Sequence, residues 1–224
     1  SNWTLFANDG PTPLSGAGAP GSTDVQSDAS FKIGTYNLAE SAGPAGYTAS
    51  SWSCAGGSQN GSAITLALGE SATCTISNDD ELPSLTLDKI VVNNNGGSAA
   101  EPEWTLFAND GPTPISGPGA AGSSDVQSGA TFQAGTYNLS ESTGPVGYTA
   151  SAWNCAGGSL NGSALTLALG ESATCTISND DAEPGLTLVK VVTNNNGGSA
   201  VPADWILTAT GPTGFSGPGP SVSN

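Results

Sequence analysis

A repeat of fixed period constrains the fold of this chain more than any other feature. The segment WTLFANDG begins at Trp3 and returns at Trp104, and a third tryptophan, Trp205, follows after the same interval of 101 positions. Segments such as GTYNL and LALGESATCTISNDD recur at that interval too. A period of this length is the size of a domain, so the chain is an array of similar domains rather than a solenoid of short repeats.

The repeat divides the chain into three units, which we expect at residues 1–81, 85–181 and 186–224. The first unit lacks the LTLxK segment that opens the other two, and the third stops before its Tyr-x-Leu-x-Glu segment. The joints ELPS (81–84) and AEPG (182–185) are short and contain proline. Such joints are semi-rigid, so the sequence predicts domains arranged as a rod.

Glycine and proline recur at short intervals, with β-branched residues between them. The 32 glycines and 15 prolines among 224 residues leave little room for long helical patterns. Short apolar runs bounded by turn residues are typical of β-strands. We therefore predict an all-β fold of tandem Ig-like β-sandwiches of about 100 residues each.

The charge of the chain excludes several functions. Its net charge is −16. Its basic residues are three lysines, and it contains no arginine and no histidine. Nucleic acid and anionic membranes are therefore improbable partners, and no apolar run is long enough to insert into a membrane. The absence of histidine removes His-based catalytic triads and metal sites. We expect no enzyme with turnover and no cofactor.

The four cysteines form two pairs with equal spacing, Cys54 with Cys74 and Cys155 with Cys175. Four buried free thiols are the alternative to two disulfides. Equal spacing in both repeats favours disulfides, which persist outside the cell. Closing a loop of this length stabilises a fold by about 3 kcal/mol in the chain-entropy model.

The strand patterns place a lysine on an apolar face. Because successive strand side chains point to opposite faces, Leu85, Leu87 and Lys89 share one face. The third unit repeats this arrangement with Lys190. By the same alternation Glu141 shares a face with Tyr137 and Leu139, and the asparagine of the last strand shares one with apolar residues. The repeating unit thus directs one Lys, one Glu and one Asn inward. These are Lys89, Glu141 and Asn179 in the second unit, Glu40 and Asn78 in the first, which lacks the lysine, and Lys190 in the third.

Burial shifts the pKa of such groups toward their neutral forms. A neutral lysine amine is a nucleophile, and a protonated carboxylic acid can shuttle protons. Together with an asparagine amide they could form a Lys–Asn isopeptide bond in a single turnover. A buried Lys–Glu ion pair at the rim of the sandwich, with Asn179 in a turn or at an edge, is the alternative.

A longer motif strengthens the first interpretation. The segments YNLAESAGPAGY (36–47) and YNLSESTGPVGY (137–148) fit Tyr-x-Leu-x-Glu-x-x-x-Pro-x-Gly-Tyr. This resembles the glutamate strand of SpaA-like, or CnaB-type, prealbumin-fold domains of bacterial surface proteins and pili. The resemblance implies a Lys–Asn bond promoted by Glu141 (Glu40 in the first unit), with Lys89 and Asn179, and Lys190 and Asn78, as cross-linking residues. The cysteine pairs and the NNNGG segments depart from that pattern.

Other features suggest weaker candidate sites. The NNNGG segments (93–97 and 194–198) resemble hairpin turns. Acidic runs at 78–81 and 179–181 could bind calcium at the joints, although no metal site is indicated by spacing. Repeated tryptophans are expected in the core rather than on a sugar-binding face. Glycans are possible at the Asn-x-Ser/Thr triplets.

These observations predict a structural protein outside the cell or on its surface. We expect a segment of a bacterial filament, stalk or pilus-like fibre, in which copies join head-to-tail or continue as one long repeat chain. In the head-to-tail version, the strand at 186–193 of one copy completes the first unit of the next. An adhesin or carbohydrate-binding module is the alternative function.

Overall fold

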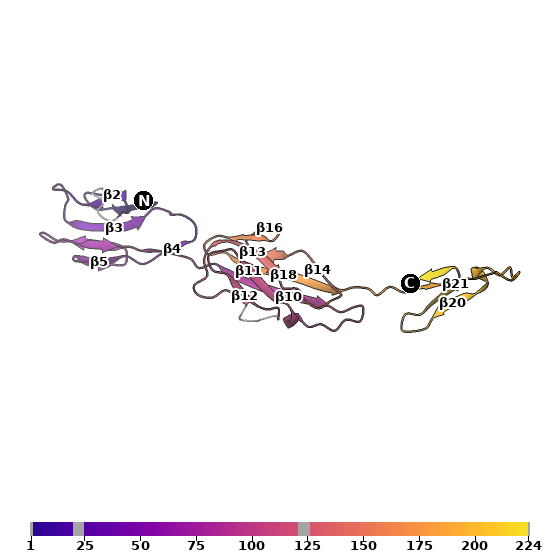
Figure 1. The fold of residues 1–224 in the computed structure, drawn as a ribbon. Helices are drawn as coiled ribbons and strands as arrows, with labels where there is room; N and C mark the ends of the chain where they lie inside the picture. The colour runs from indigo at the N-terminus through magenta and orange to yellow at the C-terminus, as the bar shows by residue number, and fades with distance from the viewer. Residues whose placement is uncertain (1, 20–24, 121–125, 224) are drawn as a thin grey trace. The chain divides into compact units, whose positions relative to one another are not determined.

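The computed structural model (Figure 1) describes residues 2–19, 25–120 and 126–223. Its regular elements are short β-strands, apart from single turns of 3-10 helix such as η2 (Glu101–Glu103) and η4 (Pro202–Asp204). The predicted all-β class is therefore confirmed. The three repeats are described separately below, and the arrangement of the repeats as a rod stays a prediction.

The second repeat contains two sheets. One has five strands in the order β12-β11-β13-β17-β16, with every neighbouring pair antiparallel. Its strands are β11 (Thr105–Asn109), β12 (Ile115–Pro118), β13 (Gly135–Glu141), β16 (Ser159–Asn161) and β17 (Ala164–Leu167). The alternation of buried and exposed residues along β13 shows that one face of this sheet covers the core.

The other sheet of this repeat has β18 (Ser172–Asp181) in its centre. β10 (Ser84–Val92) lies on one side of β18, and β14 (Tyr148–Ala150) and β15 (Asn154–Ala156) pair along the other. Leucines of β10 and alternate residues of β18 belong to the same buried apolar cluster as β11, β13 and β17. The second repeat is thus a β-sandwich whose first and last strands are neighbours.

The first repeat has the same five-stranded sheet, in the order β2-β1-β3-β7-β6. It contains β1 (Thr4–Asn8), β2 (Leu14–Ala17), β3 (Gly34–Glu40), β6 (Ser58–Asn60) and β7 (Ala63–Leu66). Facing strands form two short pairs: β4 (Tyr47–Ala49) with β9 (Asn78–Asp80), and β5 (Ser53–Ala55) with β8 (Thr73–Thr75). The residues that are continuous in β18 are split here between β8 and β9, in a repeat whose described residues include no counterpart of β10.

The third repeat contains two antiparallel strand pairs among its described residues. β19 (Thr187–Val189) pairs with β22 (Ser221–Ser223), and β20 (Ile206–Ala209) pairs with β21 (Phe215–Pro218). β19 is three residues long, whereas β10 at the same place in the second repeat has nine. The same LTLxK sequence therefore forms a longer strand where β18 is available as a partner.

Both NNNGG segments correct a prediction. They are loops that carry the chain from one sheet to another, not turns of a hairpin, because β10 pairs with β18 while the next strand, β11, belongs to the five-stranded sheet. Glycine is nevertheless required within them, since Gly96 has φ of 100° and Gly197 has φ of 88°. Positive φ is the conformation that glycine adopts without steric cost.

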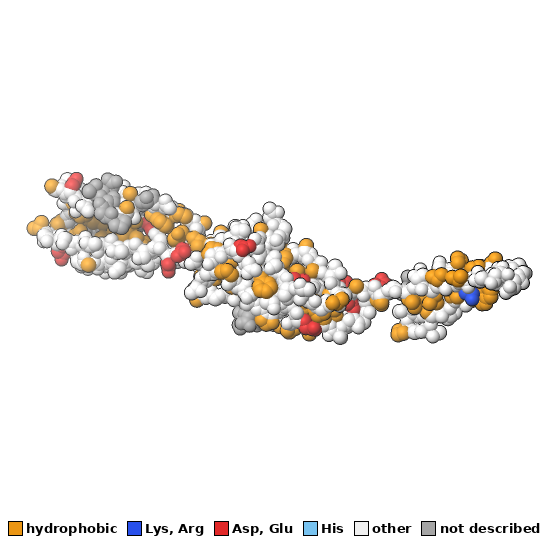
Figure 2. Space-filling model, viewed as in Figure 1, with side chains coloured by type: hydrophobic (Ala, Val, Ile, Leu, Met, Phe, Trp, Pro, Cys, Tyr) orange, Lys and Arg blue, Asp and Glu red, His pale blue; other side chains and the backbone are white. Residues whose placement is uncertain are grey.

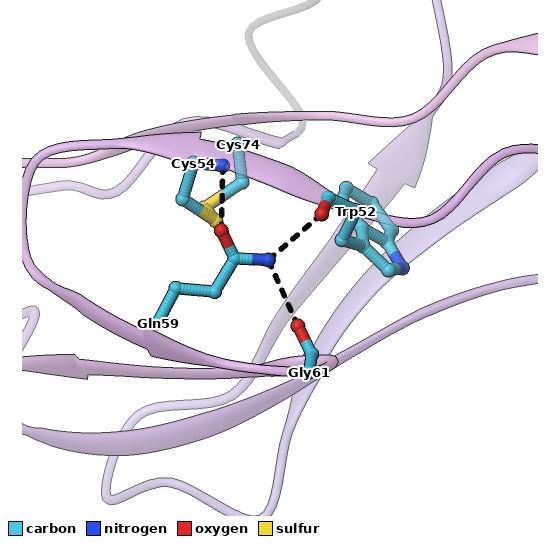
Figure 3. The surroundings of a disulfide bond; sticks show 5 residues. All are labelled: Trp52, Cys54, Gln59, Gly61 and Cys74. Carbon is cyan, nitrogen blue, oxygen red and sulfur yellow. Dashed lines mark hydrogen bonds between the residues drawn. A yellow bond between two sulfur atoms is a disulfide. The ribbon is translucent and has the colours of Figure 1, made fainter.

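The structure joins Cys54 to Cys74 and Cys155 to Cys175. Each bond links residues that face one another directly across an antiparallel strand pair. Beside the first bond, the Gln59 side chain accepts a hydrogen bond from the Cys54 N–H and donates to the backbone oxygens of Trp52 and Gly61 (Figure 3). Leu160 takes the place of Gln59 in the second repeat. These three side-chain hydrogen bonds are therefore specific to the first repeat.

Candidate cross-linking site

Lys89 is buried because β10 alternates with the period of a strand. Leu85, Leu87 and Lys89 are each 1% exposed, whereas Ile90 on the other face is 43% exposed. The predicted inward face of this strand is therefore confirmed, and the lysine lies on it with the leucines. A charged group in such a place must be paired or neutralised, since isolated burial of an ammonium is costly.

The partner of Lys89 is Glu141, the last residue of β13. The Lys89 ammonium donates to Glu141 Oε2 at 2.6 Å. Its Nζ also lies 4.8 Å from the centroid of the Trp104 ring. The aliphatic stem packs so closely on Gly119 that a Cβ there would come within 2.8 Å of Lys89 Cβ. One carboxylate, one indole face and one glycine are thus among the groups that surround this side chain.

The pKa of Lys89 is the result of opposed influences. Burial lowers the pKa below the ordinary value of 10.5, while the hydrogen bond and the charge of Glu141 raise it, and burial prevails. A lowered pKa increases the fraction of neutral amine at a given pH. This is the direction that a nucleophilic role for the amine requires.

Asn179 is also buried, at 3% exposure, within β18. β18 is the central strand of its sheet and lies beside β10, the strand of Lys89. The alternative that placed Asn179 in a turn or at a sheet edge is therefore wrong. The other part of that alternative, an ion pair between Lys89 and Glu141, is present in the structure, although Lys89 is in the core and not at a rim.

The first repeat shows how the glutamate and the asparagine meet. Asn78 Nδ2 donates to Glu40 Oε2 at 2.9 Å. Glu40 and Asn78 occupy the positions of Glu141 and Asn179 one repeat earlier. One carboxylate position thus receives the lysine in the second repeat and the asparagine in the first, which is the position a proton shuttle between the two groups would need.

The third repeat supplies the lysine half of the arrangement. Lys190 Nζ lies 4.5 Å from the centroid of the Trp205 ring, which matches the contact between Lys89 and Trp104. The 224 residues include no glutamate or asparagine at the corresponding later positions of this repeat. Within these 224 residues all three occur together in the second repeat, and the roles assigned to them stay predictions.

Sequence reasoning predicted that Trp104 is buried, but it did not predict the contact of Trp104 with the lysine or the role of Gly144. Trp104 forms one wall of the lysine pocket and is 1% exposed. Gly144 lies against its indole ring, since a Cβ at that glycine would come within 1.9 Å of Trp104 Nε1. The signal was available, because Trp3 and Gly43 repeat the pair at the same spacing and make the same close contact.

The expectation that every tryptophan lies in the core is confirmed for Trp104 and wrong for Trp205, which is 40% exposed. Trp3, Trp52 and Trp153 are half-buried. Among the described residues, β20, which follows Trp205, pairs with β21 in a two-stranded sheet. The exposure of Trp205 does not by itself define a sugar-binding face.

Asp181 anchors the first NNNGG loop. Its carboxylate accepts hydrogen bonds from the backbone N–H groups of Asn94, Asn95 and Gly97, the last at 2.6 Å. Burial would raise the pKa of Asp181, but these three donors outweigh it and hold the pKa below the ordinary 3.8. The acidic run at 179–181 therefore organises a loop within its own repeat.

The sequence suggested calcium as a minor possibility in the acidic runs 78–81 and 179–181 at the joints. Within residues 2–19, 25–120 and 126–223, no group of three or more His, Cys, Asp or Glu side chains could hold a metal ion. Calcium at the joints stays an untested hypothesis. In the same described residues, no helix is long and apolar enough to cross a membrane.

Comparison with known proteins identifies the domains. A family model of the SpaA type, described as a prealbumin-like fold domain, matches residues 1–76, 80–177 and 181–224. No curated protein and no solved structure matches the chain. Domains of this type are structural modules typical of cell-surface proteins. With its repeated sandwich and its inward lysine and glutamate, the chain belongs to the SpaA-type family of prealbumin-like fold domains.

Proposed function

We propose that this chain is a load-bearing segment of an extracellular bacterial filament, stalk or pilus-like fibre, and that its complete repeat is stapled by a Lys89–Asn179 isopeptide bond. The observation that carries the proposal is the buried Lys89 amine, 1% exposed and 2.6 Å from Glu141. The family adds that such domains serve as structural modules of cell-surface proteins.

The chemistry needs one proton-transfer group and no co-reactant. The Glu141 carboxylate takes a proton from the Lys89 ammonium, and the neutral amine attacks Cγ of Asn179. A C–N bond forms to the lysine while the bond to the Asn179 amide nitrogen breaks. Glu141 returns this proton to that nitrogen and passes on a second proton from the attacking lysine nitrogen, so that the leaving group departs as ammonium and the chain loses one ammonia. The balance is one amide formed, one amide broken and one ammonia lost.

The positions of the two residues give the bond its mechanical value. Lys89 lies on the first strand of the repeat and Asn179 on the last, and these strands are neighbours in one sheet. Tension applied along the chain enters at the first strand and leaves at the last. A covalent bond between them carries that tension without unfolding the strands between.

The proposal extends to partners and surroundings. We expect the partner of this segment to be further copies of the same domain, either along one chain or between chains. The acidic surface, with a net charge of −16, keeps such an assembly soluble and away from nucleic acid and anionic lipid. We propose no cofactor, since amide exchange at this site requires none.

Intact mass of the purified chain tests the bond. We expect the mass to fall short of the sequence by one ammonia, beyond the hydrogens lost in the two disulfides. Glu141→Gln and Lys89→Arg should each restore the missing mass. Lys32→Arg, which changes an exposed lysine outside the site, is the matched control and should keep the loss. A wild-type mass with no missing ammonia refutes the staple, and peptide mapping must locate the bond at Lys89 and Asn179.

A further inference from the structure

We propose that Asn161, which precedes Gly162 in an exposed turn of the second repeat, is a site of slow self-modification. Its side-chain amide is converted to a carboxylate without any enzyme. The same dipeptide is restrained at two other places in the chain, by Gln59 in the first repeat and by Asp181 in the second. The reaction depends neither on the filament nor on the isopeptide bond proposed above.

The dipeptide Asn-Gly occurs at residues 60–61, 95–96, 161–162 and 196–197. Asparagine is one of the chemically labile residues of proteins, because the backbone nitrogen that follows it can attack the side-chain amide. Glycine in the next position favours the attack, since it has no Cβ to hinder the approach and its backbone rotates freely. Residues 60–61, 95–96 and 161–162 place the same dipeptide in three different surroundings.

The reaction needs water and no other co-reactant. The backbone nitrogen of Gly162 loses its proton to a base in the solvent and forms a bond to Cγ of Asn161. The bond from Cγ to the side-chain nitrogen breaks, and this nitrogen takes up a proton from the solvent and leaves as ammonia. Water then opens the resulting succinimide at one of its two carbonyls, which yields aspartate or isoaspartate. The balance is one water consumed and one ammonia released.

The turn at Gly162 leaves room for this reaction. Asn161 pairs with Ala164, so Gly162 and Ser163 form the two-residue turn between β16 and β17. Gly162 has φ of 63°, and a Cβ built on it would have nothing within 4 Å. Asn161 and Gly162 are both exposed. Among the residues that the structure describes, none forms a hydrogen bond with the Asn161 side chain, so the amide can turn toward the Gly162 nitrogen.

The corresponding turn of the first repeat has an additional restraint. Gly61 has φ of 62°, and Asn60 pairs with Ala63, as in the turn one repeat later. The Gln59 side chain donates to the Gly61 oxygen at 2.8 Å and is itself held by two further hydrogen bonds beside the disulfide (Figure 3). Leu160 cannot form this bond in the second repeat. A hydrogen bond that resists movement of the turn should make Asn60 react about 2- to 10-fold more slowly than Asn161.

Asn95 is exposed as well, but Asp181 holds it on both sides of the reacting bond. Asn95 Nδ2 donates to the backbone oxygen of Asp181 at 2.8 Å. The backbone N–H groups of Asn95 and Gly97 donate to the Asp181 carboxylate. Ring closure has to break the first bond and rotate the backbone between the other two, while the negative charge opposes loss of the proton from Gly96. Asn95 should therefore react at least about 10-fold more slowly than Asn161.

Reaction at Asn161 changes both the turn and the charge of the surface. Isoaspartate adds a methylene group to the main chain, and a two-residue turn sets the register of its strands, so the pairing of β16 with β17 should loosen. β16 is the outer strand of its sheet, and the strands of the core keep their partners. Each event also adds a negative charge to a chain of net charge −16, whose acidic side chains are scattered over the first and second repeats in Figure 2.

The test follows each dipeptide by peptide mapping while the folded 224-residue chain is incubated at mildly alkaline pH. Isoaspartate should accumulate first at Asn161, then at Asn60, and last at Asn95. The reference is the same chain unfolded in denaturant with its disulfides reduced. There Asn60 and Asn161, which share the sequence Asn-Gly-Ser, should react at the same rate. The ratio of folded to unfolded rates at each site then reports the effect of the structure alone.

Two variants remove the two restraints. Gln59→Leu gives the first repeat the residue of the second, so Asn60 should react as fast as Asn161. Asp181→Asn removes the charged acceptor and should accelerate the reaction at Asn95 by about 10-fold. Asp180→Asn is the matched control, because it changes the exposed neighbour, and it should leave the rate at Asn95 unchanged. In every variant the rate at Asn161 should stay that of wild type, which shows that the second repeat is folded.

Two results overturn the proposal. One is a folded chain in which Asn161 reacts no faster than Asn95. The other is an Asn161 that stays intact in the folded chain and reacts in the unfolded one, since the turn would then protect it. An unchanged rate at Asn60 in Gln59→Leu would reject the restraint by Gln59. The Lys89–Asn179 bond does not affect these readouts, because it joins two peptides in the map, whereas a succinimide at Asn161 lacks its ammonia within one peptide.

Discussion

At the scale of single residues, the chemistry of this domain depends on where one amine is placed. Lys89 shares its strand face with leucines, and burial lowers its pKa while Glu141 limits the shift. A lone buried lysine would tend to be neutral but unreactive without a proton acceptor. In the proposed reaction, Glu141 therefore has two roles: it balances the charge of Lys89, and it accepts and returns the proton.

Glu141→Gln tests this balance through stability. The variant should fold without the staple and leave Lys89 buried without its carboxylate, which costs about 3–5 kcal/mol. The folded pKa of Lys89 then lies below its unfolded value of 10.5. The unfolded state binds the proton more readily, so stability should rise with pH from the folded pKa up to 10.5. Denaturant unfolding of the second repeat at several pH values measures this.

The control for that pH dependence is a double variant. Glu141→Gln with Lys89→Met removes the titrating amine, and its stability should not change with pH over the same window. If the single and double variants have parallel pH profiles, Lys89 is not the group that titrates.

Gly144→Ala tests the wall of the lysine pocket. The new Cβ would lie 1.9 Å from Trp104 Nε1, so the indole must move away from Lys89. Overpacking of this kind costs about 1–3 kcal/mol, and cross-linking should slow because the lysine loses its packing. Intact mass against time after synthesis follows the reaction. Gly129→Ala, with no atom within 4 Å of its Cβ, should behave as wild type.

At the scale of elements, one sequence segment forms different strands in two repeats. With β10 beside it, the last strand is the continuous ten-residue β18, whereas in the first repeat the corresponding residues form the separate strands β8 and β9. The sequences ATCTISNDD are identical in the two repeats. The difference therefore comes from the partner strand and not from local propensity, as is common for β-structure.

The NNNGG loop gives a prediction at this scale. Asp181→Asn keeps the shape of the side chain but replaces a charged acceptor of three backbone N–H groups. Amide exchange at Asn94, Asn95 and Gly97 should accelerate. In wild type the folded pKa of Asp181 is below 3.8, so its stabilisation is present above that pH and is lost as pH falls through the folded pKa. Protection should therefore persist somewhat below pH 3.8.

Asp180→Asn is the control for the loop, because Asp180 is the exposed neighbour on the same strand. Its exchange profile should match that of wild type. Equal acceleration in both variants would mean that the loop responds to the loss of any nearby charge rather than to the Asp181 contacts.

At the scale of the whole molecule, the sequence predicted the all-β repeat and the inward faces of Lys89, Glu141 and Asn179, because the alternation along a strand and the 101-residue repeat can both be read from the sequence without knowing which strands pair. It did not predict which strands are neighbours or that the NNNGG segments link two sheets, since sheet order depends on contacts distant in sequence. It also placed Trp205 in a core, because the pattern of a strand does not reveal whether its partners are present.

The response of the whole chain to tension gives a further prediction. In the stapled chain, the 89 residues between Lys89 and Asn179 are bypassed when tension is applied at the two ends. Single-molecule extension of wild type should therefore show no step from this segment. Glu141→Gln should add a step of roughly 300 Å when its disulfide is reduced, from about 3.3–3.6 Å per extended residue.

The disulfide supplies an internal calibration for that measurement. The Cys155–Cys175 bond has a sequence separation of 20, so leaving it oxidised should shorten the variant's step by roughly 70 Å. Lys32→Arg should extend as wild type does. A full step of roughly 300 Å in the reduced wild-type chain would show that tension passes through the folded strands. The buried Lys89–Glu141 pair would then be an ion pair within a core that unfolds under load, and no covalent tie would protect the repeat.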